Sequence, residues 1–177
     1  MSNKERLIFD SPARPSPGSP ILRIGMGDGV VAGVPHIISS SGLGSCVVVT
    51  LYDSKRKLGG LAHIMLPDSH NLNGYHSVYE CADTAIAALI KGLQIKRATL
   101  SDMVAKLVGG SSMFSSSENF SPGIGEQNII STKYTLKQKR IPLIGENTGG
   151  NYGRNVEFYL DSGRVTVKAI GQEVREI

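Results

Sequence analysis

The chain contains no tryptophan, and aromatic residues make up only 6% of its 177 positions. It has only two cysteines, Cys46 and Cys81, too few for the disulfide framework of a small secreted domain. No apolar run approaches the roughly 20 residues that a membrane-spanning helix needs, and no signal peptide core follows the N-terminus. The sequence therefore predicts a cytoplasmic protein without direct membrane insertion, whose thiols stay reduced.

Positive charge is in modest excess, with a net charge of +4 and a pI near 9.1. Basic runs occur at residues 55–57, 96–97 and 137–140. Nucleic-acid binding would need clustered basic and aromatic residues, and the low aromatic content argues against it. Such runs are typical of solvated loops and helix faces. If the excess charge has a function, electrostatic steering toward an acidic protein partner fits it better.

The length suits one domain with a real core. Residues 1–20 are rich in proline and serine, which predicts a flexible tail, and residues 21–177 would form the domain. Many short β-branched runs surround two helical patterns. The first runs from about Val78 to Leu93 behind a Ser77–Glu80 capping box, with Cys81 on its buried face. The second ends near Gln138. This mixture predicts an α/β fold of layered mixed or antiparallel sheets with helices packed outside.

A β-hairpin is predicted between residues 47–52 and 59–66, two apolar runs joined by a charged turn. A fold-back centred near Ser54 and Lys55 would place Cys46 directly opposite His63. Opposite residues in an antiparallel pair have Cβ atoms about 4.5–5.5 Å apart. The hairpin therefore predicts a cysteine and a histidine that meet at the mouth of a glycine turn.

That pairing suits nucleophilic catalysis, because an imidazole can take the proton of a weakly acidic thiol. The preceding turn contains Gly44 and Ser45, and its exposed N–H groups, including that of Cys46, could hold a developing oxyanion. A third polar group commonly orients the base. The hydroxyl of Ser40 or of Ser41 could take that role.

Structural interpretations of the same residues remain open. A lone cysteine at the start of an apolar strand is usually a small buried hydrophobe, and a lone histidine is more often part of the core. The four histidines match no common zinc-binding spacing, so we expect neither a metal nor another cofactor.

Several motifs, in order along the chain, resemble the CheD family of chemoreceptor glutamine deamidases. The run Gly42-Leu43-Gly44-Ser45-Cys46-Val47 is followed seventeen positions after the cysteine by His63, and a second match is Gly149-Gly150-Asn151-Tyr152-Gly153-Arg154. The resemblance extends from Ile21 to Lys168 and includes the run Ile124-Gly125-Glu126-Gln127-Asn128.

The resemblance implies a layered α/β fold and a protein-glutamine deamidase in which Cys46 is the nucleophile and His63 the base. The family has a threonine at the position of Ser40, so Ser40 would complete the triad with a hydroxyl and without the methyl group. It also implies chemoreceptor cytoplasmic domains as substrates and a CheC-type phosphatase as a partner. Two other functions remain open: a noncatalytic or dual-role module that regulates that phosphatase, and a different thiol hydrolase.

Overall fold

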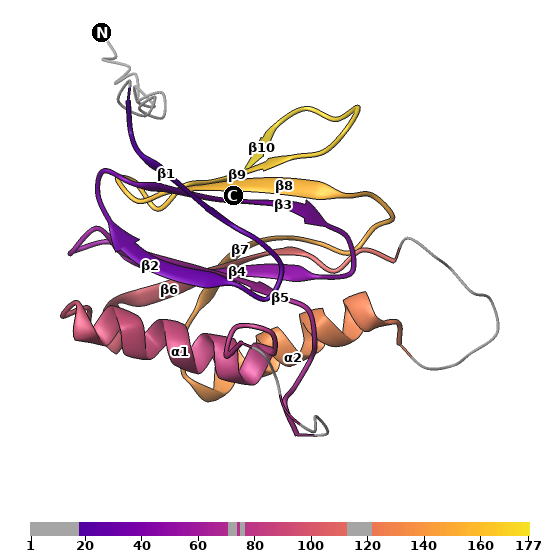
Figure 1. Ribbon diagram of the computed structural model, residues 1–177, viewed down its shortest axis with the longest axis horizontal. Coiled ribbons are helices and arrows are strands. Elements are labelled where there is room, and N and C mark those ends of the chain that lie inside the picture. Colours follow the sequence, from indigo (N-terminus) through magenta and orange to yellow (C-terminus); the bar gives the residue numbers. More distant parts are fainter. Residues whose placement is uncertain (1–17, 71–73, 75–76, 113–121) are drawn as a thin grey trace, which may run out of the picture.

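Two five-stranded sheets stack face to face, and two helices cover the free face of one of them (Figure 1). The computed structural model describes residues 18–70, 74, 77–112 and 122–177. Nearly all of the predicted tail, residues 1–20, lies outside the described residues, so that prediction stays open. The order of layers is helices, central sheet and outer sheet, which confirms the predicted α/β architecture.

The central sheet lies between the helices and the outer sheet. Its order is β2 (Gly29–Gly33), β5 (Leu58–Ile64), β4 (Val47–Asp53), β6 (Met103–Gly109) and β7 (Leu143–Thr148). All neighbours are antiparallel except β6 and β7, which run parallel.

The outer sheet has the order β1 (Ile21–Ile24), β3 (Ile37–Leu43), β8 (Arg154–Tyr159), β9 (Val165–Lys168) and β10 (Arg175–Glu176). Strand β1 runs parallel to β3, and the other pairs are antiparallel. The turn between β8 and β9, Asp161-Ser162-Gly163, has the composition that is typical of a hairpin. Strand β3 was not predicted, because its Ser39-Ser40-Ser41-Gly42 run looks like a polar loop.

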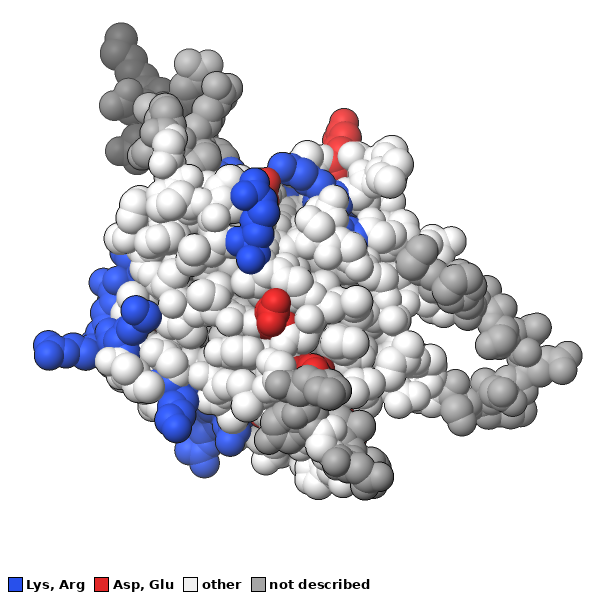
Figure 2. Space-filling view, in the orientation of Figure 1, with Lys and Arg blue, Asp and Glu red and all other residues white. Residues whose placement is uncertain are grey.

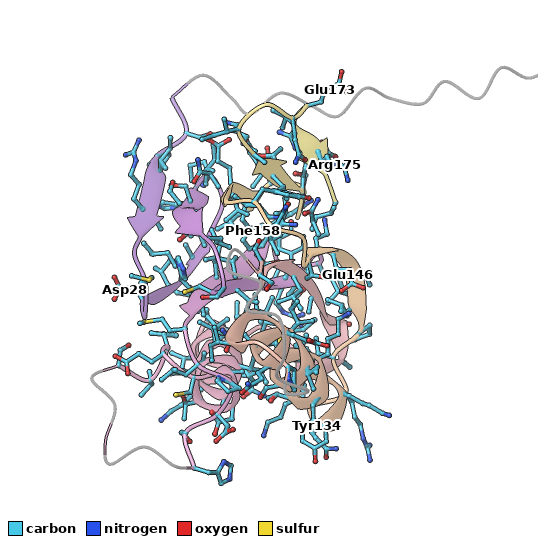
Figure 3. The ribbon with its side chains drawn as sticks, turned by 90° about the vertical axis from the view of Figure 1, so that its right-hand side faces the viewer. Asp28, Tyr134, Glu146, Phe158, Glu173 and Arg175 are labelled. Carbon is cyan, nitrogen blue, oxygen red and sulfur yellow. The ribbon has the colours of Figure 1, made fainter. Side chains whose placement is uncertain are left out.

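Strand β4 is buried on both faces, which explains why its sequence is mostly apolar instead of alternating with polar residues. Val47 and Val49 pack toward the helices, whereas Val48 and Tyr52 pack toward the outer sheet. Phe158 of β8 belongs to the hydrophobic cluster between the two sheets (Figure 3). Each such side chain contributes about 1.5–3 kcal/mol when fully buried.

The predicted β4–β5 hairpin is confirmed, but the predicted register is wrong. The loop between the strands consists of residues 54–57. The fold-back is therefore centred between residues 55 and 56, one position later than the predicted centre between Ser54 and Lys55. Val48 faces His63 directly, which leaves Cys46 diagonal to it on the same face. In a regular ladder such diagonal neighbours lie about 7–8 Å apart.

Helix α1 spans Ala82–Ile95 and starts later than predicted. Ser77 and Glu80 do not form a capping box, because Ser77 Oγ accepts from the Tyr79 N–H in a turn ahead of the helix. The Glu80 carbonyl accepts hydrogen bonds from the Met65 and Leu66 N–H groups, so this segment is paired with the chain after β5 before the helix begins. Cys81 is fully buried, as predicted.

Helix α2 (Ile124–Gln138) begins at the same end of the molecule as the link between β3 and β4, on the right in Figure 1. A short 3₁₀ turn, Leu100–Asp102, precedes β6. Both α-helices finish at the opposite end, where lysine and arginine side chains gather (Figure 2). Cations near helix C-termini are favourable because of the helix dipole. None of the described helices is long and apolar enough to cross a membrane.

Candidate active site

Cys46 lies in the short turn that joins β3 to β4, immediately before β4. Three consecutive carbonyls of this turn accept hydrogen bonds from neighbouring segments. Gly44 O accepts from Ser111 N at 2.8 Å, and Cys46 O accepts from Gly110 N at 2.8 Å. Between them, Ser45 O accepts from Asn128 Nδ2 at 3.0 Å. The turn is thus held on its outside by the loop after β6 and by α2.

These bonds also fix the direction of the N–H groups. In a trans peptide the carbonyl and the following N–H point in opposite directions. Anchoring the carbonyls of Gly44 and Ser45 therefore directs the N–H groups of Ser45 and Cys46 away from their anchors. The Cys46 N–H also interacts with the thiol of its own residue.

Gly109 makes the close approach between β6 and the cysteine turn possible. Its φ is +112°, and a Cβ atom at this position would lie only 2.3 Å from Cys46 O. A larger residue would push the cysteine turn away from β6, so the glycine is needed for both the backbone conformation and the space.

A pocket of about 370 Å³, the Cys46 pocket, opens at this end of the molecule. The cysteine turn, the loop after β6, the start of α2 and the exposed Met26 form its walls. The lining residues are Met26, Gly42, Gly44, Ser45, Cys46, Ser111, Ser112, Gly123, Ile124 and Gly125. Glycine and serine predominate, so the pocket presents much backbone and few large side chains.

His63 reaches Ser40 across the interface between the two sheets. Ser40 Oγ lies 2.8 Å from His63 Nδ1, and the Ser40 hydroxyl donates to Ile24 O at 3.0 Å. A hydroxyl has only one proton, so Ser40 must accept from Nδ1–H of His63. The unprotonated nitrogen is then Nε2, which has no hydrogen-bond partner in the described part of the chain. The imidazole is therefore held as the tautomer that a general base requires.

Between the two predicted candidates, Ser40 is the one that contacts His63. Ser40 is 2% exposed and points into the space between the sheets. Ser41 is exposed, because successive side chains of a strand alternate between its two faces.

Burial favours the neutral form of both reacting groups in the free protein. Desolvation raises the pKa of the Cys46 thiol, an effect partly offset by its own backbone N–H. Desolvation also lowers the pKa of His63, which the charge of Asp28 offsets in part. Both shifts favour a thiol and a neutral imidazole over a preformed ion pair.

Asn128 belongs to this site, although the sequence did not predict a role for it. The side chain is fully buried on α2, and its Nδ2 donates to Ser45 O and to Met65 O, each at 3.0 Å. It therefore links the residue before Cys46 to the second residue after His63. The available signal was its place in the family-like run Ile124-Gly125-Glu126-Gln127-Asn128.

The described residues contain no group of three or more histidine, cysteine or acidic side chains that could hold a metal ion. The expectation of a protein without a metal stays a prediction. The Cys46 thiol lines the pocket, and a buried imidazole held by a hydroxyl lies on the neighbouring strand, which are the groups that a cysteine-dependent site uses.

Comparison with known proteins identifies the family. The CheD family, described as CheD chemotactic sensory transduction, matches residues 65–169. A protein of Caldanaerobacter subterraneus subsp. tengcongensis, named probable chemoreceptor glutamine deamidase CheD, is 46% identical over 160 residues, covering 90% of this chain and 99% of that protein. A protein of the same name from Clostridium acetobutylicum is 43% identical over 157 residues, covering 88% and 95%. The chain belongs to the CheD family.

Among solved structures, the hypothetical protein YfiH of Bacillus licheniformis is similar, with a TM-score of 0.44 and 17% identity. The match covers 70% of this chain and 51% of that one.

Proposed function

We propose that this protein is a glutamine deamidase that converts glutamine side chains of chemoreceptor cytoplasmic domains to glutamate. The central observation is the Ser40–His63 hydrogen bond at Nδ1. His63 Nε2 has no hydrogen-bond partner in the described structure, and His63 lies on the strand that pairs with the one directly after Cys46. The names of relatives that match over nearly their whole length support the same reaction and substrate.

In the first half-reaction the Cys46 sulfur attacks the carbon of the carboxamide. His63 Nε2 takes the thiol proton as the carbon–sulfur bond forms, because burial favours the neutral form of both groups beforehand. The N–H groups of Ser45 and Cys46 bind the oxyanion of the tetrahedral intermediate. The imidazolium then gives its proton to the amide nitrogen, ammonia leaves, and a thioester remains.

In the second half-reaction water cleaves the thioester. His63 Nε2 takes a proton from water, and the resulting hydroxide attacks the carbonyl carbon. The carbon–sulfur bond breaks, the thiol recovers its proton and the product is glutamate. Throughout both steps Ser40 holds the ring and accepts from Nδ1–H, so the hydrogen bond strengthens while the ring carries positive charge.

The biological setting completes the proposal. Deamidation would create acidic residues in receptors during chemotactic adaptation, in the cytoplasm, and a CheC-type phosphatase would be a regulatory partner. These points rest on family resemblance. A noncatalytic or dual role in regulating that phosphatase is the alternative, and the preserved contacts around Cys46 and His63 favour catalysis.

The direct test is peptide mass spectrometry of a receptor cytoplasmic fragment after incubation with the wild type, Cys46→Ala or Cys81→Ala. We expect the mass gain of amide-to-acid conversion at specific glutamines with the wild type and with Cys81→Ala. Cys46→Ala should give none. If the folded wild-type protein leaves a cognate receptor unchanged, the regulatory alternative replaces the deamidase.

A further inference from the structure

A second pocket of about 390 Å³ adjoins the Cys46 pocket, and the two share Gly42. Its walls come from the end of β3, from β8 and from the chain after β9. They include Gly42, Tyr152, Arg154, Asn155, Lys168 and Ile170. We name this hollow the Arg154 pocket.

Gly42 forms an open boundary between the two pockets. Its φ is +76°, and a Cβ atom built on it would have no neighbour within 4 Å. Its N–H donates to Asn155 Oδ1 at 3.0 Å, which ties this boundary to β8. Gly42 itself places no side chain between the two pockets, so within the described structure they are open to each other at this position.

Arg154 is a buried cation, and the residues that the structure describes place no counter-charge next to it. It is 2% exposed, and its Nε donates to Asn147 Oδ1 at 2.7 Å. Its Nη1 donates to Ser111 Oγ at 2.6 Å and to Tyr152 O at 3.2 Å, and the guanidinium lies 4.0 Å from the centre of the Tyr152 ring. All of these partners are neutral.

The described residues provide Arg154 with no carboxylate within ion-pair distance, and its Nη2 makes no hydrogen bond among them. Lys168 in the same pocket differs, because its Nζ pairs with Glu157 at 3.1 Å. Burying an uncompensated charge is costly, and a free guanidinium edge in a pocket is a carboxylate-binding arrangement.

We propose that the Arg154 pocket is a substrate subsite that binds the carboxylate of an acidic side chain close to the target glutamine. This inference rests on the proposed deamidase function and assigns that site a preference for glutamines with acidic neighbours. The acidic side chain would pair with Arg154 Nη2 while the glutamine occupies the Cys46 pocket. The pairing would tighten binding without touching the reacting atoms, so KM should change more than kcat.

The test compares two receptor peptides that share a target glutamine and differ only by glutamate or alanine at its neighbours. Ile170 is fully exposed on the rim of the Arg154 pocket, so its replacement should preserve the fold. Ile170→Glu should raise KM for the acidic peptide about three- to tenfold and Ile170→Lys should lower it, with kcat within about twofold. KM for the neutral peptide should change less than KM for the acidic peptide in both variants.

Arg154 itself is tested with Arg154→Gln and Arg154→Lys. Arg154→Gln should remove the preference for the acidic peptide, and Arg154→Lys should restore part of it. Arg164→Gln is the matched control, because Arg164 also lies over a tyrosine ring, at 4.1 Å, but pairs with Glu176. It should keep the full preference. Equal responses of both peptides to the Ile170 charge variants would overturn the subsite.

A peptide-binding measurement tests the Arg154 subsite independently of the deamidase reaction. Both peptides, carrying a fluorophore, are titrated onto Cys46→Ala with and without the Ile170 substitutions. A charge-dependent preference for the acidic peptide, together with no deamidation by the wild type, would uphold the subsite and refute the deamidase. Deamidation without that preference would uphold the deamidase and refute the subsite.

Discussion

Ser40 and His63 meet across the two sheets, with Ser40 Oγ 2.8 Å from His63 Nδ1. Ser40 comes from β3 of the outer sheet and His63 from β5 of the central sheet. The Ser40 hydroxyl donates its proton to Ile24 O of the parallel neighbour β1. Ser40 Oγ must therefore accept the other hydrogen bond, from Nδ1–H of His63. The packing of the two sheets therefore sets the tautomer of the base.

Ser40→Ala should lower kcat about 10- to 100-fold, because the imidazole loses the acceptor that holds its Nδ1–H. Ser40→Thr keeps the hydroxyl and should retain activity within about threefold. The measurement is the rate of glutamine conversion in a receptor fragment. Ser41→Ala, an exposed neighbour, serves as the control. An equal loss in Ser40→Ala and Ser41→Ala would contradict the role of the buried hydroxyl.

The alkylation of Cys46 by iodoacetamide should keep accelerating above pH 9. Burial raises the pKa of this thiol, so the thiolate fraction grows only in alkaline solution. Cys81 is an internal control, because burial raises its pKa to about 11 and the residue is fully buried. Peptide mapping should find the label on Cys46. A rate that levels off below pH 7 would reveal a preformed thiolate instead.

The free energy of unfolding should fall as the pH decreases below about 6.5. Burial lowers the pKa of His63 in the folded state, so the unfolded chain takes up a proton first. The contribution of neutral His63 is complete above the unfolded pKa and is lost as the pH falls toward the folded pKa. Urea unfolding of the wild type and of His63→Gln at several pH values measures this contribution to the free energy of unfolding. His63→Gln should show a shallower slope, and parallel curves would exclude His63 as the source.

Asn128→Ala should lower kcat/KM about 10- to 100-fold, because the turn before Cys46 and the chain after His63 lose their common donor. Ser131→Ala is the matched control on the same helix. Ser131 donates to Pro67 O after β5 but does not touch the cysteine turn. Its kcat/KM should stay within about twofold of the wild type. Thermal unfolding of both variants shows how much of any loss comes from stability.

If Asn128→Ala and Ser131→Ala lowered the melting temperature equally but differed in kcat/KM as expected, Asn128 would be a positioning residue. Each lost buried hydrogen bond should cost about 1–3 kcal/mol of unfolding free energy. Equal kcat/KM values in the two variants would assign Asn128 a purely structural role.

Local sequence patterns were sufficient for the elements with strong periodicity. The β4–β5 hairpin, the β8–β9 hairpin and the second helix follow from apolar runs, turn residues and helical spacing, and each is present. The first helix was predicted with the wrong start, because the segment around Glu80 pairs with the chain after β5. Strand β3 was missed because its serine run looks like a polar loop, and Ser40 becomes buried only where the central sheet covers it.

The sequence by itself determined which groups the proposed chemistry uses. A cysteine after a glycine turn, a histidine on the returning strand and a hydroxyl six positions before the cysteine are all visible in the order of residues. The same motifs carry the resemblance of the chain to the CheD family. Alternation along the strands also places Cys46 and His63 on one face, whether the register is the predicted one or the observed one.

Tertiary structure decided how these groups are arranged. Loop length moved Cys46 from directly opposite His63 to a diagonal position, and sheet packing selected Ser40 over Ser41. The contributions of Asn128 and Arg154 depend on contacts between segments far apart in the chain. Such contacts have no local periodicity, because hydrogen bonds between distant segments depend on how the layers pack and not on the residues beside them in sequence.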